Sequence, residues 1–305
     1  MNALRYLLGL MLVVLFAAPA GAVKPAPDSM TGAAVSVGAF SVVPLLDGSH
    51  SFTLNLFKGA DEAAMQKAAG GQSSMPGSFN VFLIKRGKER FLVDTGIGTL
   101  FPGKTGQLPL CLKAAKTAPE AVSKIFITHL HGDHIGGLIK DGKPAFPKAK
   151  VYVSKAEYDY WMSDEAMRQA PEDRRGGFTP AREAMRVLEQ NKLLVLFTPG
   201  DVIAPDIAGV ALPGHTPGHT GFLLTSNGKK LFFVGDLLHG AALQMPRPDI
   251  TIAFDVDQPK AKETRLRVFK QLAEETTPIA GAHLPFPGIG LVRPDGAGYK
   301  LEALK

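Results

Sequence analysis

A short run of histidines with one aspartate constrains this chain more than any other feature of its sequence. The run is Thr128-His-Leu-His-Gly-Asp-His134, and it directly follows the apolar stretch Ile125-Phe-Ile127. Side chains two residues apart on an extended segment point to the same side, so His129 and His131 can both reach one ion. Asp133 and His134 come in the next turn, displaced enough to serve a second ion. The pattern predicts metal binding at the end of this strand, rather than an unrelated cluster of surface or core histidines.

Three further polar residues each close an apolar run elsewhere in the chain, which is how a rigid fold presents ligands along one rim. His215 lies in Pro213-Gly-His-Thr-Pro-Gly-His219, Asp236 ends Leu231-Phe-Phe-Val-Gly-Asp236, and His283 ends Ile279-Ala-Gly-Ala-His283. Asp236, a carboxylate with two oxygens, is the natural bridge between two ions. The remaining ligands are then sorted into one set of His129, His131 and His215 and a second set of Asp133, His134 and His283.

Two adjacent cations would give this site a definite chemistry. Imidazole and carboxylate ligands suit Zn²⁺, and also Mn²⁺, Fe²⁺ or Co²⁺. Two ions about 3.5–4 Å apart lower the pKa of a shared water from about 15.7 towards ~7, which gives a bridging hydroxide at neutral pH. We therefore expect hydrolysis at a dinuclear centre, with Asp133 and Asp236 as the candidate catalytic residues.

Two residues beside these ligands are expected to support the site. Asp94 ends the run Arg90-Phe-Leu-Val-Asp94. Its carboxylate could accept the free ring N–H of a ligand histidine, although an aspartate before Thr95-Gly96 could also form a turn. His239 lies three residues past Asp236 and is expected to line the pocket or carry a proton. Metal ligation by His239 is disfavoured because six terminal ligands and a bridge already fill two sites.

The order of apolar segments predicts two sheets packed face to face with helices outside, in one domain over residues 23–305. Two hairpin turns are expected, one at Arg86-Gly-Lys-Glu89 and one at Asn227-Gly228. The stretch 48–76 is expected to be a long loop and a candidate lid. Strand signals lie at 39–44, 80–85, 90–94, 124–128, 151–153, 193–197, 209–212, 219–225, 230–235 and 278–282, and helix signals at 118–123, 157–161, 181–191 and 260–275.

The first 22 residues have the pattern of a secretory signal peptide. Arg5 precedes an apolar run that ends at Phe16, and small residues then lead to an expected cleavage site after Ala22. The run is shorter than the ~20 residues of a spanning helix, which disfavours a membrane anchor. We therefore expect a periplasmic or secreted protein without stable membrane insertion. Cys111 is the only cysteine, so no intramolecular disulfide is possible, and we expect it to be buried.

These residues together resemble the metallo-β-lactamase superfamily, whose HxHxDH signature corresponds to His129–His134 and whose later ligands match His215, Asp236 and His283. Val93-Asp-Thr-Gly96 also matches. Within the superfamily the chain is similar to the methyl parathion hydrolase branch and its lactonase-like relatives. The resemblance implies an α/β fold, a four-layer αβ/βα sandwich with the metals at one edge, and a homodimer. It also implies a substrate pocket lined by aromatic residues at Phe101, Trp161 and Phe178, with His239 in place of an apolar pocket residue.

The function class that these features favour is a hydrolase of small neutral esters: lactones, aryl esters, or organophosphate triesters such as methyl parathion and paraoxon. A β-lactamase is one alternative, although Asp133-His134 with His283 is more typical of the lactonase type. A mononuclear iron oxygenase of sulfur compounds shares the fold and would leave the second site unused. A nuclease is disfavoured because the net charge of +6 is spread without a basic run. A metal-binding protein without catalysis is the last alternative.

Overall fold

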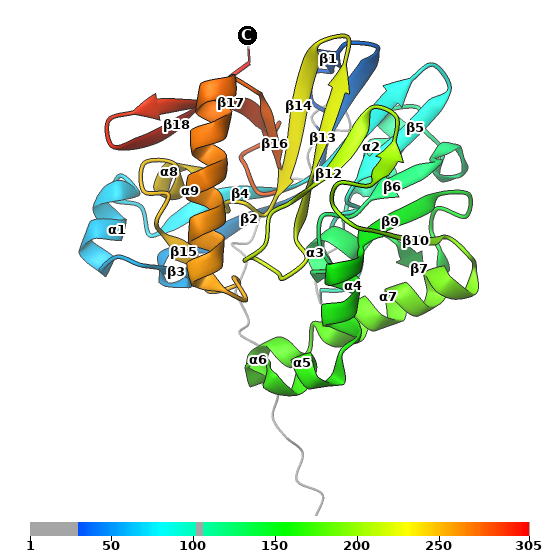
Figure 1. Ribbon diagram of the computed structural model, residues 1–305, viewed down its shortest axis with the longest axis horizontal. Helices are drawn as coiled ribbons and strands as arrows, with labels where there is room; N and C mark the ends of the chain where they lie inside the picture. The colour runs from blue at the N-terminus through cyan, green and yellow to red at the C-terminus, as the bar shows by residue number, and fades with distance from the viewer. Residues whose placement is uncertain (1–29, 102–105, 305) are drawn as a thin grey trace, which may run out of the picture.

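Two seven-stranded sheets pack face to face, and helices lie outside them (Figure 1). The structure is a computed structural model that describes residues 30–101 and 106–304. One sheet has the strand order β1-β2-β4-β5-β6-β9-β10, and the other has the order β11-β12-β13-β14-β16-β17-β18. The αβ/βα sandwich expected from the sequence is confirmed.

The strands are unequal in length, and the longest two form a ribbon in the first sheet. The first sheet comprises β1 (Val35–Val37), β2 (Phe40–Thr53), β4 (Ser74–Arg86), β5 (Glu89–Val93), β6 (Lys124–Phe126), β9 (Lys150–Ser154) and β10 (Leu194–Phe197). The second comprises β11 (Val202–Ala204), β12 (Ile207–Ala211), β13 (Thr220–Ser226), β14 (Lys229–Gly235), β16 (Ile279–Gly281), β17 (Ile289–Asp295) and β18 (Gly298–Ala303). Two short pairs join β3 (Phe57–Lys58) to β15 (Thr251–Ile252) and β7 (Ile139–Lys140) to β8 (Lys143–Pro144).

Phenylalanine side chains fill the space between the two sheets. Phe82 of β4 meets Phe233 of β14, and Phe126 of β6 meets Phe222 of β13, with ring centroids 5.4 and 5.3 Å apart. All four side chains are buried, and aromatic residues of this size each bury about 150–250 Å². This packing fixes β6 and β14 relative to one another, and five of the seven predicted ligands follow the ends of these two strands.

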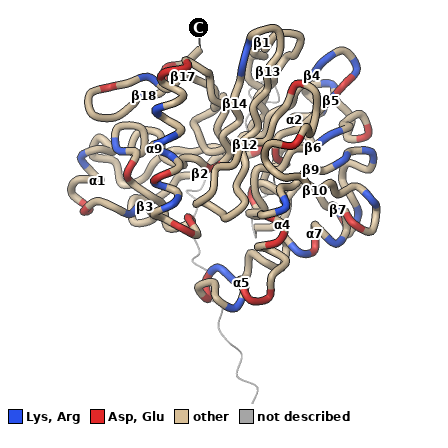
Figure 2. Tube along the Cα trace, viewed as in Figure 1, with Lys and Arg blue, Asp and Glu red and all other residues tan. Residues whose placement is uncertain are grey.

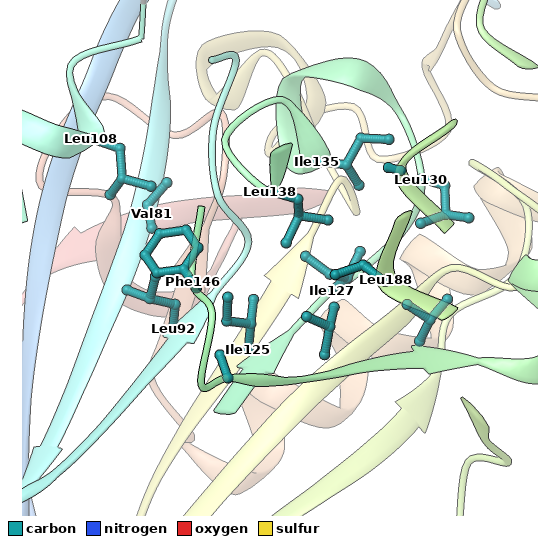
Figure 3. Close-up of a cluster of buried hydrophobic side chains, with 14 of the residues drawn as sticks. Val81, Leu92, Leu108, Ile125, Ile127, Leu130, Ile135, Leu138, Phe146 and Leu188 are labelled. Carbon is teal, nitrogen blue, oxygen red and sulfur yellow. The ribbon is translucent and has the colours of Figure 1, made fainter. Parts of the chain in front are cut away.

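Helices cover the outer face of each sheet. Leu92 and Ile125 point towards the outer helices, whereas their neighbours Phe91 and Phe126 point to the other sheet, as the two-residue period of a strand requires. Figure 3 shows this outer layer, in which Ile125 and Ile127 belong to the same apolar cluster as Leu188 of α7. The helices are α1 (Glu62–Ala68), α2 (Leu108–Ala114), α3 (Gly132–Ile135), α4 (Lys155–Met162), α5 (Asp164–Gln169), α6 (Glu172–Arg175), α7 (Phe178–Gln190), α8 (Ala241–Gln244) and α9 (Gln258–Glu275).

The segment 48–76, expected to be a loop and a candidate lid, is instead largely regular structure. β2 and β4 stay paired as far as Thr53 and Ser74, and a 3-10 turn, β3 and α1 fill the span between them. Phe52 and Met65 from this segment are buried in an apolar cluster of their own. The loop prediction is wrong because the positions that alternate with the exposed Ser49 and Ser51 include Gly48 and His50, so the apolar half of the strand pattern is missing.

Other differences concern single elements. The helix expected at 118–123 is a single 3-10 turn, Pro119–Ala121, and several elements were not predicted, among them α2, α5, β17 and β18. Cys111 is fully buried, as expected. The predicted signal peptide lies outside the described residues, and no helix within the described part of the chain is long and apolar enough to cross a membrane. Figure 2 shows basic and acidic residues interspersed along the chain, in line with the scattered charge of the sequence.

Candidate metal centre

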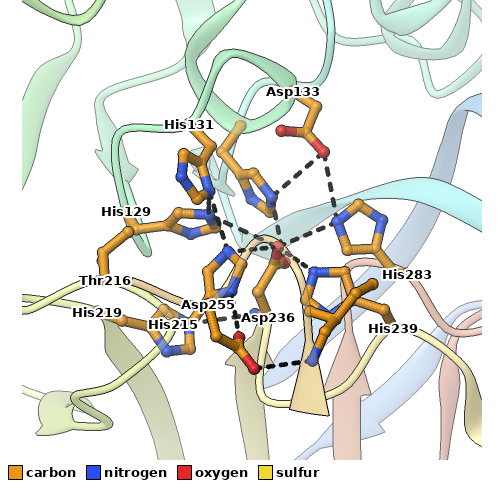
Figure 4. A network of polar contacts seen from close by, with 12 residues as sticks. His129, His131, Asp133, His215, Thr216, His219, Asp236, His239, Asp255 and His283 are labelled. Atoms are coloured by element: carbon orange, nitrogen blue, oxygen red, sulfur yellow. Dashed lines mark hydrogen bonds and ion pairs between the residues drawn. The ribbon is translucent and has the colours of Figure 1, made fainter. Parts of the chain in front are cut away.

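The seven predicted metal ligands come together at the ends of strands from both sheets (Figure 4). His129 and His131 follow β6, and α3 carries Asp133 and His134. From the second sheet, His215 lies in the loop between β12 and β13, Asp236 follows β14, and His283 follows β16. His131 and Asp133 are partly exposed and the other five are buried, so the cluster is open to solvent on the side of these two residues.

The first group of ligands consists of His129, His131, His215 and Asp236, whose ligand atoms all lie within 4.8 Å of one another. Nδ1 of His131 is 2.9 Å from Nε2 of His129 and 2.9 Å from Nε2 of His215. Oδ2 of Asp236 is 3.2 Å from Nε2 of His215. Three ring nitrogens and a carboxylate oxygen therefore point at one small volume.

The second group consists of Asp133, His134 and His283. Oδ2 of Asp133 is 3.3 Å from Nε2 of His283 and 3.7 Å from Nε2 of His134. Asp236 reaches this group too, because its Oδ1 is 3.1 Å from Nε2 of His134 and its Oδ2 is 3.1 Å from Nε2 of His283. The carboxylate of Asp236 thus lies between the two groups, in the position expected of a bridge.

The orientation of the histidine rings shows that this set of donor atoms fits divalent cations. The outer nitrogen Nδ1 of His134, His215 and His283 contacts an oxygen of Asp94, Asp255 or Ser78 at 2.8–3.0 Å. Donation of Nδ1–H to these oxygens leaves the lone pair of Nε2 facing the centre of the site. Nε2 of His134 and Oδ1 of Asp236 are buried 3.1 Å apart, but their geometry is not that of a hydrogen bond, and neither has another hydrogen-bond partner among the described residues. Buried polar atoms of this kind require a partner, and a cation would supply it.

Burial and the charges of neighbouring groups determine which of these histidines are protonated. Burial holds the pKa of His129 and of His131 well below the ordinary value. Burial also opposes the charged form of His215 and His283, but Asp236 more than offsets it and raises the pKa of His215 to about 9 and that of His283 to about 10. Burial is likewise outweighed at His134, where Asp236, Asp133 and Asp94 hold the pKa well above its ordinary value. Protons on these three rings balance the carboxylates when no cation is bound, so cation binding must release protons.

Two carboxylates orient ligand rings, and the sequence pointed to only one of them. Asp94 accepts from Nδ1 of His134 at 2.8 Å, and it also accepts from the backbone N–H of Thr128 at 2.8 Å. This is the type of contact expected of Asp94 from the sequence. Asp255 accepts from Nδ1 of His215 at 2.9 Å and was missed, since an aspartate in a loop far along the chain gave no sign of its partner.

His239 also lies at the site. Its Nε2 is 3.1 Å from Oδ2 of Asp236, its ring stacks on His283 with centroids 4.9 Å apart, and with those two residues it forms a third possible set of ligands. Phe52 was not predicted, yet its ring meets the edges of His239 and His283 at 5.5 and 5.3 Å. Phe52 belongs to the segment 48–76, so this segment contributes a wall of the site rather than a lid.

The three aromatic residues expected at the pocket have different environments. The Trp161 ring meets His131 edge-on at 5.4 Å and is 3% exposed. Phe178 packs against Trp161 at 4.7 Å and is 1% exposed, so it supports Trp161 from within the core. The Phe101 side chain is 42% exposed, and its ring lies 3.3 Å from where a Cβ on Gly132 would be. Trp161 therefore lies beside the partly exposed His131, and Phe101 lies beside Gly132, the next residue in the chain.

Comparisons with known proteins agree with this architecture. A solved structure of the hydrolase AbOPH, of the beta-lactamase superfamily, is 31% identical, with a TM-score of 0.84 over 90% of this chain and 97% of that one. The dizinc quorum-quenching lactonase AidC is 24% identical, with a TM-score of 0.82 over 90% of this chain and 98% of that one. The likeness to AidC shows the fold alone.

Curated relatives match over shorter stretches. The uncharacterized protein YobT of Bacillus subtilis (strain 168) is 30% identical over 166 residues, which are 54% of this chain and 62% of YobT. Hydroxyacylglutathione hydrolase of Vibrio campbellii is 32% identical over 148 residues, which are 48% of this chain and 44% of that protein. The match thus spans less than two thirds of either relative. The family model of the metallo-beta-lactamase superfamily matches residues 75–283, and the chain belongs to that superfamily.

Proposed function

We propose that the chain is a dinuclear metal-dependent hydrolase of small, neutral, ester-type substrates. The observation that carries the proposal is the position of Asp236, whose carboxylate oxygens lie 3.1–3.6 Å from ring nitrogens of five histidines. The seven residues singled out from the sequence fall into the two groups expected of them, with Asp236 between the groups. Such a concentration of buried ring nitrogens and carboxylate oxygens is typical of a metal site. In any other role, burying these polar groups together would cost folding free energy.

Each side chain then has a specific task. His129, His131 and His215 would hold one cation, Asp133, His134 and His283 the other, and Asp236 both. Two divalent cations, zinc in the simplest case, would lower the pKa of a water molecule and polarise the substrate oxygen. The chain's own contribution is orientation: Asp94, Asp255 and the carbonyl of Ser78 hold three of the rings with Nε2 facing inward.

The surroundings of the site support an uncharged substrate with an apolar substituent. Trp161 lies beside His131, and Phe101 lies beside Gly132. Phe52 lies beside His239 and His283. Apolar walls with a few convergent polar groups are typical of sites for small molecules. The lactonase AidC and the hydrolase AbOPH share the fold. We therefore infer a lactone, an aryl ester or an organophosphate triester as substrate, as in the methyl parathion hydrolase branch.

Metal analysis combined with a substrate panel tests the proposal. Purified protein should contain two ions per chain and should hydrolyse at least one of an acyl-homoserine lactone, an aryl ester and methyl paraoxon. His131→Ala should lose turnover and one ion, whereas His50→Ala, outside the clustered histidines, should keep both ions. Full activity of His131→Ala would refute the assignment. One iron per chain with oxidation of a thiol, or hydrolysis of a β-lactam alone, would identify one of the alternative functions.

We also propose that the mature protein is exported and forms a homodimer. The support is the signal-like pattern that ends at Ala22 and the resemblance to the methyl parathion hydrolase branch. Fractionation of a bacterial host, with the N-terminal sequence of the recovered protein, tests export. Light scattering of the purified protein tests the dimer.

A further inference from the structure

A buried carboxylate outside the proposed ligand set connects two separate loops of the site. Glu157, in α4, is 1% exposed. Its Oε1 accepts hydrogen bonds from the backbone N–H of Leu130 at 2.9 Å and from the indole Nε1 of Trp161 at 2.6 Å. Its Oε2 accepts from Oγ1 of Thr216 at 2.6 Å and from the backbone N–H of Gly218 at 3.1 Å.

The partners of Glu157 are the immediate neighbours of the first group of histidines. Leu130 lies between His129 and His131, and Thr216 directly follows His215. One carboxylate therefore ties the loop after β6 to the loop between β12 and β13. The inner nitrogens of His131 and His215, one from each loop, are 2.9 Å apart, so a small shift of either loop would change the geometry at the first cation.

The first turn of α4 fits closely against the second of these loops. Oγ of Ser154 donates to the carbonyl of Gly218 at 2.7 Å. A Cβ on Gly218 would lie 2.0 Å from the backbone nitrogen of Glu157, so a side chain there would force the helix and the loop apart. The start of α4 is thus held rigidly against the loop, and Glu157 extends from this fixed point towards Leu130.

Burial raises the pKa of Glu157, and the hydrogen bonds that its carboxylate accepts oppose this effect. All four groups are placed to donate a hydrogen bond to the carboxylate, two to each oxygen. A buried carboxylate is tolerated only when its oxygens are bonded in this way. Loss of the carboxylate would leave donors in both loops unsatisfied at the same time, because a network of this kind acts as a unit.

We propose that Glu157 is a positioning residue that sets the spacing of the two histidine loops and fixes the orientation of Trp161 beside them. The inference rests on the proposed metal-dependent function, since it concerns the histidines that would hold the first cation. Glu157 does not touch the reacting atoms. It acts through Leu130, Thr216, Gly218 and Trp161.

Glu157→Gln tests the role because it keeps the shape of the side chain but turns an NH₂ group towards two donors. The affinity for Zn²⁺, measured by competition with a chromophoric chelator, should fall about 10- to 100-fold for one of the two ions. Trp161 is the only tryptophan, so the metal-free protein gives one indole N–H resonance. That resonance should move upfield when the short bond to the carboxylate is lost.

Two further variants separate positioning from general destabilisation. Thr216→Val removes one of the four hydrogen bonds and should weaken zinc binding by a smaller factor than Glu157→Gln does. The indole resonance should not move in this variant. Combining Thr216→Val with Glu157→Gln should weaken zinc binding no further than Glu157→Gln alone. Asp47→Asn is the matched control, because Asp47 is a buried carboxylate that accepts from the backbone N–H groups of Ile97 and Leu108 at 2.8 and 2.6 Å. It should lower the melting temperature but leave the indole resonance and the zinc affinity as in the wild type.

The outcomes distinguish this inference from the proposed function. Wild-type zinc affinity in both Glu157→Gln and Thr216→Val overturns the inference alone, and so does an equal loss of affinity in Asp47→Asn. A wild-type protein that binds no divalent cation overturns the proposed function, and the positioning role with it. Should Glu157→Gln fail to fold, weaker zinc binding by folded Thr216→Val supports the role, and unchanged binding overturns it.

Discussion

Asp255 determines which nitrogen of His215 faces the site. Its Oδ1 accepts from Nδ1 of His215 at 2.9 Å, and its Oδ2 accepts from the backbone N–H of Ile252 at 3.0 Å. The buried guanidinium of Arg265 lies 3.9 Å from the same carboxylate. Because both oxygens are engaged, the His215 ring is held in one tautomer and one orientation, which a metal ligand requires.

Asp255→Asn should weaken zinc binding about 10- to 100-fold, because the amide can present its NH₂ group to the ring and reverse the tautomer. It should also lower the stability, because the buried guanidinium of Arg265 loses the charge beside it. Chelator competition measures the affinity. Asp257→Asn is the control: Asp257 is exposed and caps α9 through Lys260, and asparagine caps a helix equally well. An Asp255→Asn protein that binds zinc as the wild type does would show that the tautomer of His215 is fixed by something else.

His239 is the residue at which substrate preference should be altered most easily. It is buried among His283, Phe52 and Asp236, where the proposed similarity to the parathion hydrolase branch leads us to expect an apolar residue. His239→Leu should raise kcat/KM for bulky phosphotriesters relative to that for a small lactone, because the pocket wall becomes more apolar. Steady-state kinetics across substrates of increasing size measure the ratio. A ratio that does not change with size would count against a role in specificity.

At the scale of elements, strand ends were the most predictable part of the fold. The runs before His129, Asp236 and His283 are apolar on both faces, and in the structure each is a short strand buried between layers. Each then stops at a polar residue, so both the strand and its terminal ligand could be predicted. The inner parts of β2 and β4 were predicted, but the outer part of this ribbon was not, because small residues make up much of it and their partners are more than twenty residues away.

The outer part of this ribbon should therefore matter for the site and not only for stability. Phe52 is 3% exposed and contacts His239 and His283, whereas Phe91 is equally buried but lies between the sheets. Each change to alanine should cost about 3–5 kcal/mol of folding free energy. At a temperature where both variants are folded, Phe52→Ala should lose more activity per metal-loaded molecule than Phe91→Ala. Equal losses of activity in the two variants would show that Phe52 contributes to packing alone.

At the scale of the whole molecule, the site joins the two sheets. His129, His131, Asp133 and His134 follow the first sheet, whereas His215, Asp236 and His283 follow the second. The phenylalanine core between the sheets positions the two sets in the absence of metal. Cations bound between them would add a second connection at the edge of the sandwich. The sequence predicted both sets of residues, but the distances between them come from the packing of the sheets.

Removal of metal should accordingly destabilise the whole fold. A ligand that binds only the folded state at 100 times its Kd adds about 2.7 kcal/mol, which corresponds to about 5–10 °C in Tm for a domain of this size. Scanning calorimetry of chelator-treated and zinc-reloaded protein measures the difference. When zinc is added back, the Tm of His131→Ala should rise less than that of the wild type, because one ligand of the first group is missing. An identical Tm with and without zinc would mean that the two sheets hold the seven side chains in place unaided, and that cations add nothing to the connection between them.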